Sequence, residues 1–175
     1  MTILEKLPKH KDIPTDFNAV IEIPKNGGVK YEIDKDSGVL IVDRILSTPM
    51  TYPADYGYIP YTLADDGDPL DVLVINDTTL MAGSMIRVRP VGVIIMEDEA
   101  GMDEKILCVP HSKVEKFYDD IQSYEDIPLA FRKKLTHFFE HYKDLEPNKW
   151  VKLSGWEGIE KAKEIILKSV KNYKS

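Results

Sequence analysis

The chain has 175 residues, enough for one domain with a substantial core, and we expect residues 1–175 to form that single domain. A hydrophobic content of 43% and a charged content of 30% are ordinary for a globular protein, while a net charge of −7 without any basic block argues against a nucleic-acid partner. The single cysteine, Cys108, excludes an intramolecular disulfide, and no apolar run reaches membrane-spanning length or resembles a signal segment, so we expect a cytoplasmic protein without a membrane partner.

The first part of the chain predicts short strands joined by turns. Residues 19–23 have strand composition and end at a proline, and residues 29–33 alternate in polarity before a turn at Gly38 and a further strand over 39–42. Residues 47–62 hold three prolines and four tyrosines without a period. An ordered loop of this length inside a compact domain is more often functional than not.

The middle of the chain continues the strands and adds two acidic turns. Residues 65–71 (DDGDPLD) place four carboxylates in front of an apolar strand over 71–75. Residues 85–96 predict a long strand broken at a proline, a second acidic turn covers 97–104, and residues 105–109 return as an apolar strand that contains the cysteine. Short strands joined by turns favour a closed or nearly closed barrel, and the cysteine is expected to be buried in it.

The last third of the chain changes to a helical period. Two sets of apolar residues recur at spacings of three and four: Phe131, Leu135, Phe138, Tyr142 and Leu145, and then Ile159, Ala162, Ile166 and Val170. Residues 150–153 have the composition of one more strand between the two helices. We therefore expect an α+β, mainly β fold in which a small barrel is covered by peripheral helices.

The two acidic turns come together if the strands between them pair in the barrel. One end of the barrel would then hold six acids: Asp66, Asp68, Asp71, Asp98, Glu99 and Asp103. Ionised carboxylates about 5 Å apart repel by roughly 3 kcal/mol per pair at an effective dielectric of about 20, so they must protonate, turn to solvent or hold cations. Oxygen ligands without nearby Cys or His suit Mg²⁺ better than Zn²⁺. For any single acid a solvated surface position is the simpler interpretation, and for the set the residues alone leave both open.

Four cations and a group of tyrosines accompany the acids. The cations lie in or beside predicted strands and a helix instead of a charge run: Lys30, Arg44, Lys105 and Lys143. With metal ions on the acids, such cations would bind the remaining oxygens of a metal-chelated phosphate. Ordinary ion pairs are the alternative for each of them. The tyrosines of the 47–62 loop are either hydroxyl donors or packing groups: Tyr52, Tyr56, Tyr58 and Tyr61.

A competing pattern lies on the first predicted helix. His137, Glu140 and His141 spell H-x-x-E-H, the pattern of inverted zinc metallopeptidases. A zinc site needs a third protein ligand, for which Asp144 and Glu146 are the candidates, and we rank a subunit-interface role for the histidines above it. A non-catalytic OB-like binding module is a further alternative, against which the acidic balance and the lack of a basic stripe argue.

Several motifs in one order resemble the family I soluble inorganic pyrophosphatases of the shorter bacterial type. Residues 66–71 (DGDPLD) match the D-G-D-P-x-D signature of that family. Further similar segments are residues 21–24, 30–34, 42–44, 52–58, 97–105 and 137–146. Together they cover the chain from residue 10 to residue 170 without large gaps, and the resemblance implies an OB-like five-stranded closed barrel with peripheral α-helices.

The resemblance also implies a reaction: Mg²⁺-dependent hydrolysis of inorganic pyrophosphate to two orthophosphates by a metal-activated hydroxide, with Asp68 as general base. It implies about two to four Mg²⁺ ions per active site. The implied metal ligands are Asp66, Asp71, Asp98, Asp103, Glu22 and Glu32. The implied substrate-binding residues are Lys30, Arg44, Tyr52, Tyr56, Lys105, Tyr142 and Lys143.

The resemblance further implies a homo-oligomer, commonly a hexamer, with His137 and His141 at subunit contacts. One departure is Asp55, where relatives often carry Asn, and we expect it to add a negative charge near the site. Asp65 receives no role, and we expect it to be the dispensable acid of the first acidic turn.

Overall fold

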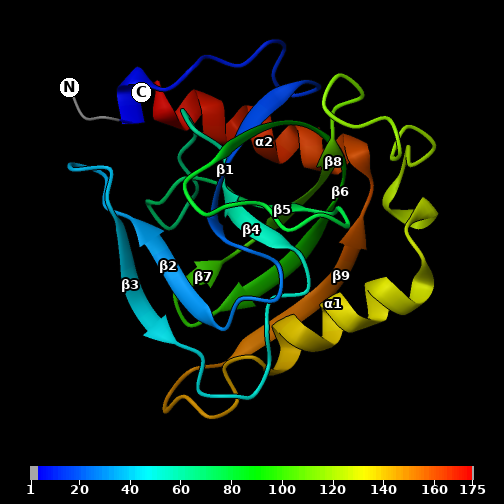
Figure 1. Ribbon diagram of the computed structural model, residues 1–175. Coiled ribbons are helices and arrows are strands. Elements are labelled where there is room, and N and C mark those ends of the chain that lie inside the picture. Colours follow the sequence, from blue (N-terminus) through cyan, green and yellow to red (C-terminus); the bar gives the residue numbers. More distant parts are fainter. Residues whose placement is uncertain (1–3, 175) are drawn as a thin grey trace.

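Five strands of this computed structural model, which describes residues 4–174, close into a ring. The order is Phe17–Ile23 (β1), Asp55–Tyr58 (β4), Asp71–Val74 (β5), Lys105–Pro110 (β8) and Met85–Asp98 (β6), after which β6 pairs with β1 (Figure 1). Neighbouring strands are antiparallel except β5 and β8, which are parallel. The prediction of an OB-like five-stranded barrel with peripheral helices is confirmed.

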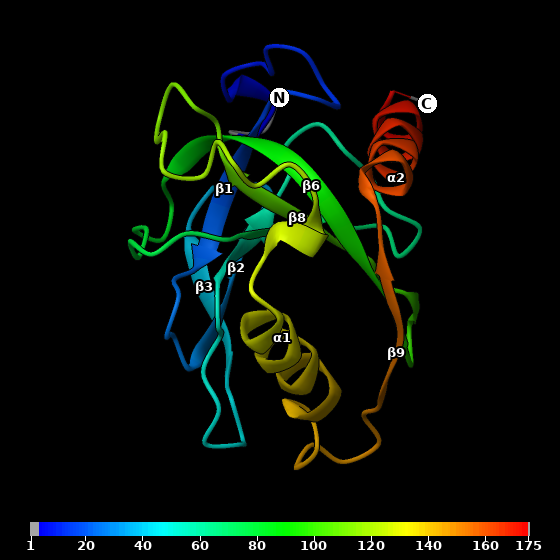
Figure 2. The same ribbon diagram turned by 90° about the vertical axis from the view of Figure 1, so that its right-hand side faces the viewer.

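Two helices and two further strands lie around the ring. Val151–Glu157 (β9) pairs with the second half of β6, and Gly101–Met102 (β7) forms a short hairpin with the end of β6. Leu129–His141 (α1) packs against β9, and Ile159–Tyr173 (α2) packs against β6; Figure 2 shows α1 beside the lower part of β9 and α2 beyond its upper end. Short 3-10 turns cover Leu4–Lys6 and Tyr124–Asp126. No helix in the described part of the chain is long and apolar enough to cross a bilayer.

A hairpin of two strands stands apart from the ring. Val29–Ile33 (β2) and Leu40–Ile45 (β3) pair with each other in a sheet of their own. Their turn is closed by the Asp34 carboxylate, which accepts hydrogen bonds from the backbone N–H and the hydroxyl of Ser37, and Gly38 adopts a left-handed φ of 73°. Because no ladder of hydrogen bonds joins this hairpin to the ring, its placement depends on chain connections and side-chain contacts.

The strands of the ring are apolar on both faces, which explains their continuous apolar runs. In β5, Val72 and Val74 belong to the core cluster under α2, while Leu73 belongs to the cluster under α1. The same alternation in β8 sends Cys108 toward α2 and Leu107 toward α1. Cys108 is fully buried, as the sequence predicts, and burial raises the pKa of its thiol well above the usual value.

Three expectations about the elements are wrong in part. The loop expected over 47–62 contains β4, a strand whose sequence (DYGY) has no run of aliphatic residues. Gly57 is required there, because a Cβ would lie 1.8 Å from the carbonyl oxygen of Val20 on β1. Pro90 does not break the strand around it, since a register shift between Pro90 and Gly92 absorbs it within β6. Leu145, expected on the buried helix face, lies beyond α1 and is 65% exposed.

Asp55 is not among the residues that line the pocket described below, although its chain neighbour Tyr56 is. Asp55 is fully buried at the start of β4, where its Oδ1 accepts hydrogen bonds from the backbone N–H groups of Lys25 (2.8 Å) and Leu80 (3.2 Å). Its Oδ2 accepts a hydrogen bond of 2.8 Å from the side-chain amide of Asn76. The carboxylate therefore fastens two loops to the barrel, and three N–H donors compensate for its burial.

Candidate active site

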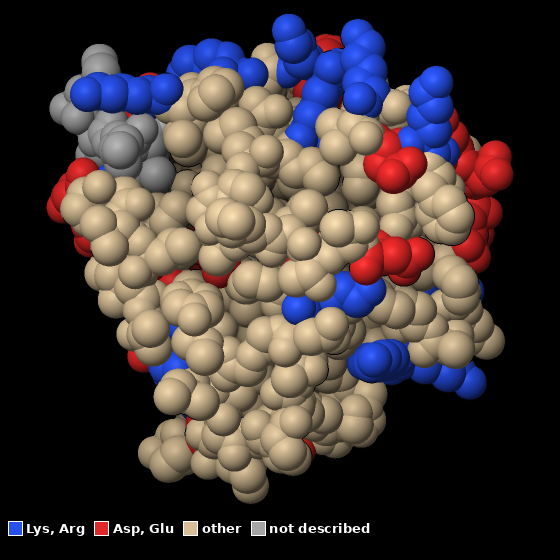
Figure 3. All heavy atoms as spheres, in the orientation of Figure 1, with Lys and Arg blue, Asp and Glu red and all other residues tan. Residues whose placement is uncertain are grey.

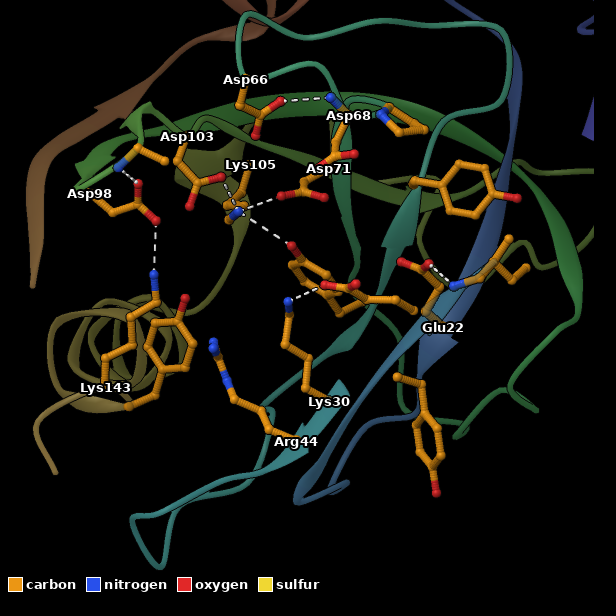
Figure 4. A pocket seen from close by; sticks show the side chains of 18 of the residues that line it. Glu22, Lys30, Arg44, Asp66, Asp68, Asp71, Asp98, Asp103, Lys105 and Lys143 are labelled. Carbon is orange, nitrogen blue, oxygen red and sulfur yellow. Dashed lines mark hydrogen bonds and ion pairs between the residues drawn. The ribbon is translucent and has the colours of Figure 1, made fainter. Parts of the chain in front are cut away.

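A pocket opens at one end of the barrel, between the β2–β3 hairpin, the first acidic turn and the end of α1 (Figure 4). Seven acids line it: Glu22, Glu32, Asp66, Asp68, Asp71, Asp98 and Asp103. Five cations line it as well: Lys30, Lys35, Arg44, Lys105 and Lys143. The two acidic turns therefore meet, with β8 lying between β5 and β6 in the ring.

The first acidic turn is shaped by local hydrogen bonds. Gly67 adopts φ 89°, a conformation that residues with a Cβ rarely take. The Asp66 carboxylate accepts a hydrogen bond from the backbone N–H of Asp68 (3.0 Å), which fixes the two acids relative to each other. At the neck of the turn the buried Thr62 hydroxyl donates to the carbonyl of Ile59 (2.5 Å) and accepts from the N–H of Leu70 (2.9 Å). Asp66 and Asp68 are thus presented at the tip, and Asp71 follows at the start of β5.

The ammonium group of Lys105 lies at the centre of the acids. Its side chain is 3% exposed and forms ion pairs with Asp71 and with Asp103, the latter at 2.5 Å (Figure 4). The parallel register of β5 and β8, in which Val72 lies opposite Ile106, places Lys105 directly beside Asp71. Burial alone would lower the pKa of this amine, but the two carboxylates raise it well above its usual value, so the group stays charged.

The other amines of the pocket are paired with carboxylates in the same way. Lys143 donates to Asp98 at 2.8 Å, and both side chains are nearly buried. Lys30 forms an ion pair with its strand neighbour Glu32, and Lys35, at the tip of the hairpin, lies 2.5 Å from Asp68. The amines therefore serve as internal counter-ions for the acids.

The charge of Glu22 is poorly compensated. It lies on β1, is 9% exposed, and accepts one hydrogen bond of 2.8 Å from the backbone N–H of Ile33. Burial raises the pKa of Glu22 to about 7, and the nearby carboxylates of Asp71 and Glu32 contribute to this shift. Burial likewise raises the pKa of Asp66. This part of the pocket is short of positive charge.

The donor set of the pocket fits hard divalent cations. As the side chains are arranged, no three His, Cys, Asp or Glu groups within residues 4–174 form a ready metal-binding group, because the carboxylates are turned to the amines. The acids of the pocket outnumber its cations, and they offer only oxygen ligands. Burial raises the pKa of two of them, Glu22 and Asp66, so their charged forms are destabilised without added positive charge. Such a set suits Mg²⁺ and not a thiolate- or imidazole-bound metal.

Of the site residues that the resemblance implies, Tyr52 alone is not among those that line the pocket. Glu99, expected with the acids at this end of the barrel, and Tyr61 do not line it either, and Glu99 pairs with Lys149 at 2.5 Å. Tyr52 is 2% exposed, and its ring packs against Tyr56 and Phe138 with centroids 5.4 Å and 4.8 Å apart, so it supports Tyr56 from behind. Burial raises the pKa of the Tyr56 and Tyr142 hydroxyls, which line the pocket, and this keeps them protonated donors at neutral pH.

Sequence reasoning missed Lys35, which lines the pocket. It lies next to the recognised segment 30–34, which is the only signal that the sequence offers. Tyr58, named as a possible donor among the loop tyrosines, also lines the pocket, and its hydroxyl is buried without a hydrogen-bond partner among the described residues. Asp65, which was given no role, forms an ion pair of 2.6 Å with Lys168 on α2, but both side chains are more than half exposed and the pair contributes little stability.

The histidine pattern on α1 does not assemble into a zinc site. The rings of His137 and His141 lie 4.5 Å apart, and His141 pairs with Asp144 at 2.8 Å. Glu146, one candidate for a third ligand, pairs instead with Arg44. Together with the absence of any ready metal-binding group in the described chain, this leaves the peptidase interpretation without support.

Comparison with known proteins identifies relatives along nearly the whole chain. The family model of the inorganic pyrophosphatases matches residues 19–174. The chain is 54% identical over 166 residues to an inorganic pyrophosphatase of Agrobacterium fabrum, covering 94% of each protein. It is 52% identical over 168 residues to one of Aquifex pyrophilus, covering 96% of this chain and 95% of the relative. Among solved structures, that of the inorganic pyrophosphatase of Helicobacter pylori superposes with a TM-score of 0.93 at 45% identity, covering 96% of this chain and 99% of the other.

The pKa of Glu22 predicts how its substitution changes stability without metal. Because the pKa rises from 4.5 to about 7 on folding, the folded protein binds a proton between these pH values that the unfolded chain does not. Stability is therefore lost as the pH rises through this window, by about 3 kcal/mol. We expect Glu22→Gln to raise the free energy of unfolding in a chelator by up to about 3 kcal/mol near pH 8, and to change it little near pH 4.5.

Urea unfolding curves of both proteins at the two pH values measure this difference. Asp65→Asn removes an exposed charge and serves as the control, for which we expect no comparable gain. A Glu22→Gln protein that is no more stable than the wild type near pH 8 would contradict the raised pKa.

Proposed function

The chain belongs to the inorganic pyrophosphatase family, and from that membership we propose how its pocket hydrolyses pyrophosphate. The protein is a hydrolase that converts pyrophosphate to two orthophosphates. The observation that carries the proposal is the meeting of two acidic turns and five cations in one pocket. We expect the reaction in the cytoplasm, since the chain has one cysteine and thus no intramolecular disulfide.

We propose Mg²⁺ as the cofactor, with about two to four ions per site. The ligands would be Asp66, Asp71, Asp98, Asp103, Glu22 and Glu32. Bound Mg²⁺ would neutralise these acids and the substrate and would lower the pKa of coordinated water. The oxygen-only donor set and the raised pKa of Glu22 support this assignment, because both favour added positive charge.

Asp68 is proposed to orient the attacking water and accept its proton. Its side chain is 66% exposed at the tip of the first acidic turn, so it reaches the pocket without being fixed in the barrel wall. Asp66 holds the backbone N–H of Asp68, which keeps the carboxylate beside the proposed metal ligands. A general base needs this combination of access to water and a defined position.

The cations and tyrosines are proposed to bind the phosphate oxygens. Lys30, Arg44 and Lys143 face Asp66, Asp71 and Asp103 across the pocket, and Lys105 lies among these acids (Figure 4). The same groups can pair with phosphate once the acids have another counter-ion. The hydroxyls of Tyr56 and Tyr142 remain protonated because burial raises the pKa of each, and they donate to oxygens on which charge develops.

Asp68→Asn tests the proposed base. We expect phosphate release from pyrophosphate in Mg²⁺ to fall by about 10²- to 10⁴-fold, the usual contribution of general base catalysis. Asp65→Asn makes the same change of charge in the same turn and is expected to leave kcat within about threefold, since Asp65 pairs with α2 outside the pocket.

Phosphate release, thermal unfolding and a chelator control are measured on the same preparations. A wild type that releases no phosphate at any Mg²⁺ concentration would overturn the proposed function. A folded Asp68→Asn protein with wild-type kcat would overturn the role of Asp68 alone.

We further propose that the chain forms a homo-oligomer, as a hexamer, with His137 and His141 at subunit contacts. Two features support this. The hairpin leaves four apolar side chains exposed on β3 and its turn: Val39, Ile41, Val42 and Ile45. The lower part of the view in Figure 3, on the side of the hairpin, has few charged side chains. Apolar surface of this kind is typical of subunit interfaces.

Sedimentation between about pH 8 and pH 5 tests the histidines. Protonation puts two positive charges 4.5 Å apart on α1, and we expect it to weaken the assembly. Asp144, which faces His141 at 2.8 Å, offsets one of the charges. His137→Gln is expected to reduce the pH dependence, and an assembly that is indifferent to pH over this range would contradict the proposal.

A further inference from the structure

The placement of Arg44 depends on few contacts, because its hairpin is not part of the barrel sheet. Arg44 lies on β3, opposite Lys30 on β2. Within residues 4–174, three hydrogen bonds or ion pairs connect the hairpin strands and turn to the walls of the pocket: Glu22 with the N–H of Ile33, Lys35 with Asp68, and Arg44 with Glu146. The first two involve groups that line the pocket, whereas Glu146 does not line it.

Glu146 and Arg44 form a largely buried ion pair. Oε1 of Glu146 lies 3.0 Å from Nε of Arg44, and the two side chains are 12% and 27% exposed. The contact is one of charge, since the buried Nε–H of Arg44 has no hydrogen-bond partner among the described residues. Asp43, the other acid near this guanidinium, is more distant at 3.9 Å. Within residues 4–174 the Glu146 carboxylate has no second cation, and its Oε2 is buried without a hydrogen bond. A buried carboxylate is costly unless it is paired, so the position of Glu146 is tied to that of Arg44.

The turn that carries Glu146 also carries two groups of the pocket. It follows α1 directly, and the N–H of Glu146 donates to the carbonyl of Lys143 at 2.9 Å. Tyr142 and Lys143, which line the pocket, are therefore in fixed register with Glu146. Figure 4 shows the guanidinium of Arg44 pointing into the pocket on the side of Lys143. The ion pair thus connects the hairpin wall of the pocket to the α1 wall.

We propose that Glu146 is a positioning residue for phosphate binding, which acts by holding the guanidinium of Arg44 through this ion pair. Both acids near the guanidinium approach it on the Nε side, so the two terminal nitrogens can bind a phosphate group, the fork geometry that favours arginine over lysine at such sites. This inference rests on the proposed function of the pocket. The alternative is an ion pair that stabilises the hairpin and has no effect on substrate.

Glu146→Gln separates the two roles because it retains size and removes the charge. If Glu146 positions Arg44, the interaction lost is one of binding, and we expect KM for pyrophosphate to rise about five- to tenfold with kcat within about threefold. Glu140→Gln is the matched control, since Glu140 lies in the last turn of α1 and is exposed. It is expected to leave both constants within about twofold.

A double-mutant cycle with Arg44→Ala decides whether the effect passes through Arg44. We expect Glu146→Gln to change kcat/KM by less than about twofold in the Arg44→Ala background, although it has its full effect in the wild type. Thermal unfolding of all four proteins, recorded alongside, confirms that each is folded at the assay temperature. Calorimetric titration with inorganic phosphate gives a second readout, in which the same coupling is expected.

Two results would overturn the positioning role: equal effects of Glu146→Gln in both backgrounds, or an unchanged KM in the single variant. Wild-type activity measured in parallel keeps this test apart from the test of the pocket. If the wild type is active and the effects of Glu146→Gln and Arg44→Ala on kcat/KM are additive, only the role of Glu146 is contradicted. If the wild type is inactive, the proposed function is contradicted.

Discussion

The repulsion among seven carboxylates in one half-buried pocket is the constraint on which the rest of this structure depends. Carboxylates at such separations destabilise one another unless positive charge lies between them. Lys105 meets this need at the centre, since the parallel pairing of β5 and β8 places it between Asp71 and Asp103. Because the lysine is almost fully buried, its charge is weakly screened by solvent and both acids are strongly attracted to it.

The same constraint explains why the pocket is built from parts outside the barrel. The ring strands supply three of the seven acids and the turns beside them another three, whereas three of the five cations lie on the hairpin. The hairpin and the turn after α1 must therefore be fixed against each other, and the ion pair of Arg44 with Glu146 does this. Glu22 is destabilised by this arrangement, because burial raises the pKa of its carboxyl group and disfavours the charged form in the absence of metal. Stability is lost at a site that is suited to cations.

The sequence predicts those features that local chemistry determines. The D-G-D-P-x-D turn places acids before an apolar strand, and the doubly apolar runs of β5 and β8 follow from burial on both faces. Strand β4 was not predicted, because Asp55–Tyr58 is stabilised by pairing with β1 and β5 and not by an apolar pattern. The contacts of Asp55 and the pairing of Arg44 with Glu146 join residues far apart in the chain, and no local signal reports them. The resemblance of motifs predicted most of the residues that line the pocket. Only the fold shows that Tyr52 packs against Tyr56 and does not line the pocket itself.

The central claim is that acids from two separate turns form one cation site that serves pyrophosphate hydrolysis. Calorimetric titration of Mg²⁺ into Asp71→Asn and Asp103→Asn, with phosphate release measured on the same samples, tests it most directly. These acids lie on different segments and share Lys105. The account predicts that either substitution weakens the same Mg²⁺ binding step and lowers phosphate release in parallel. Unchanged Mg²⁺ binding in both variants, or wild-type hydrolysis in excess chelator, would contradict it.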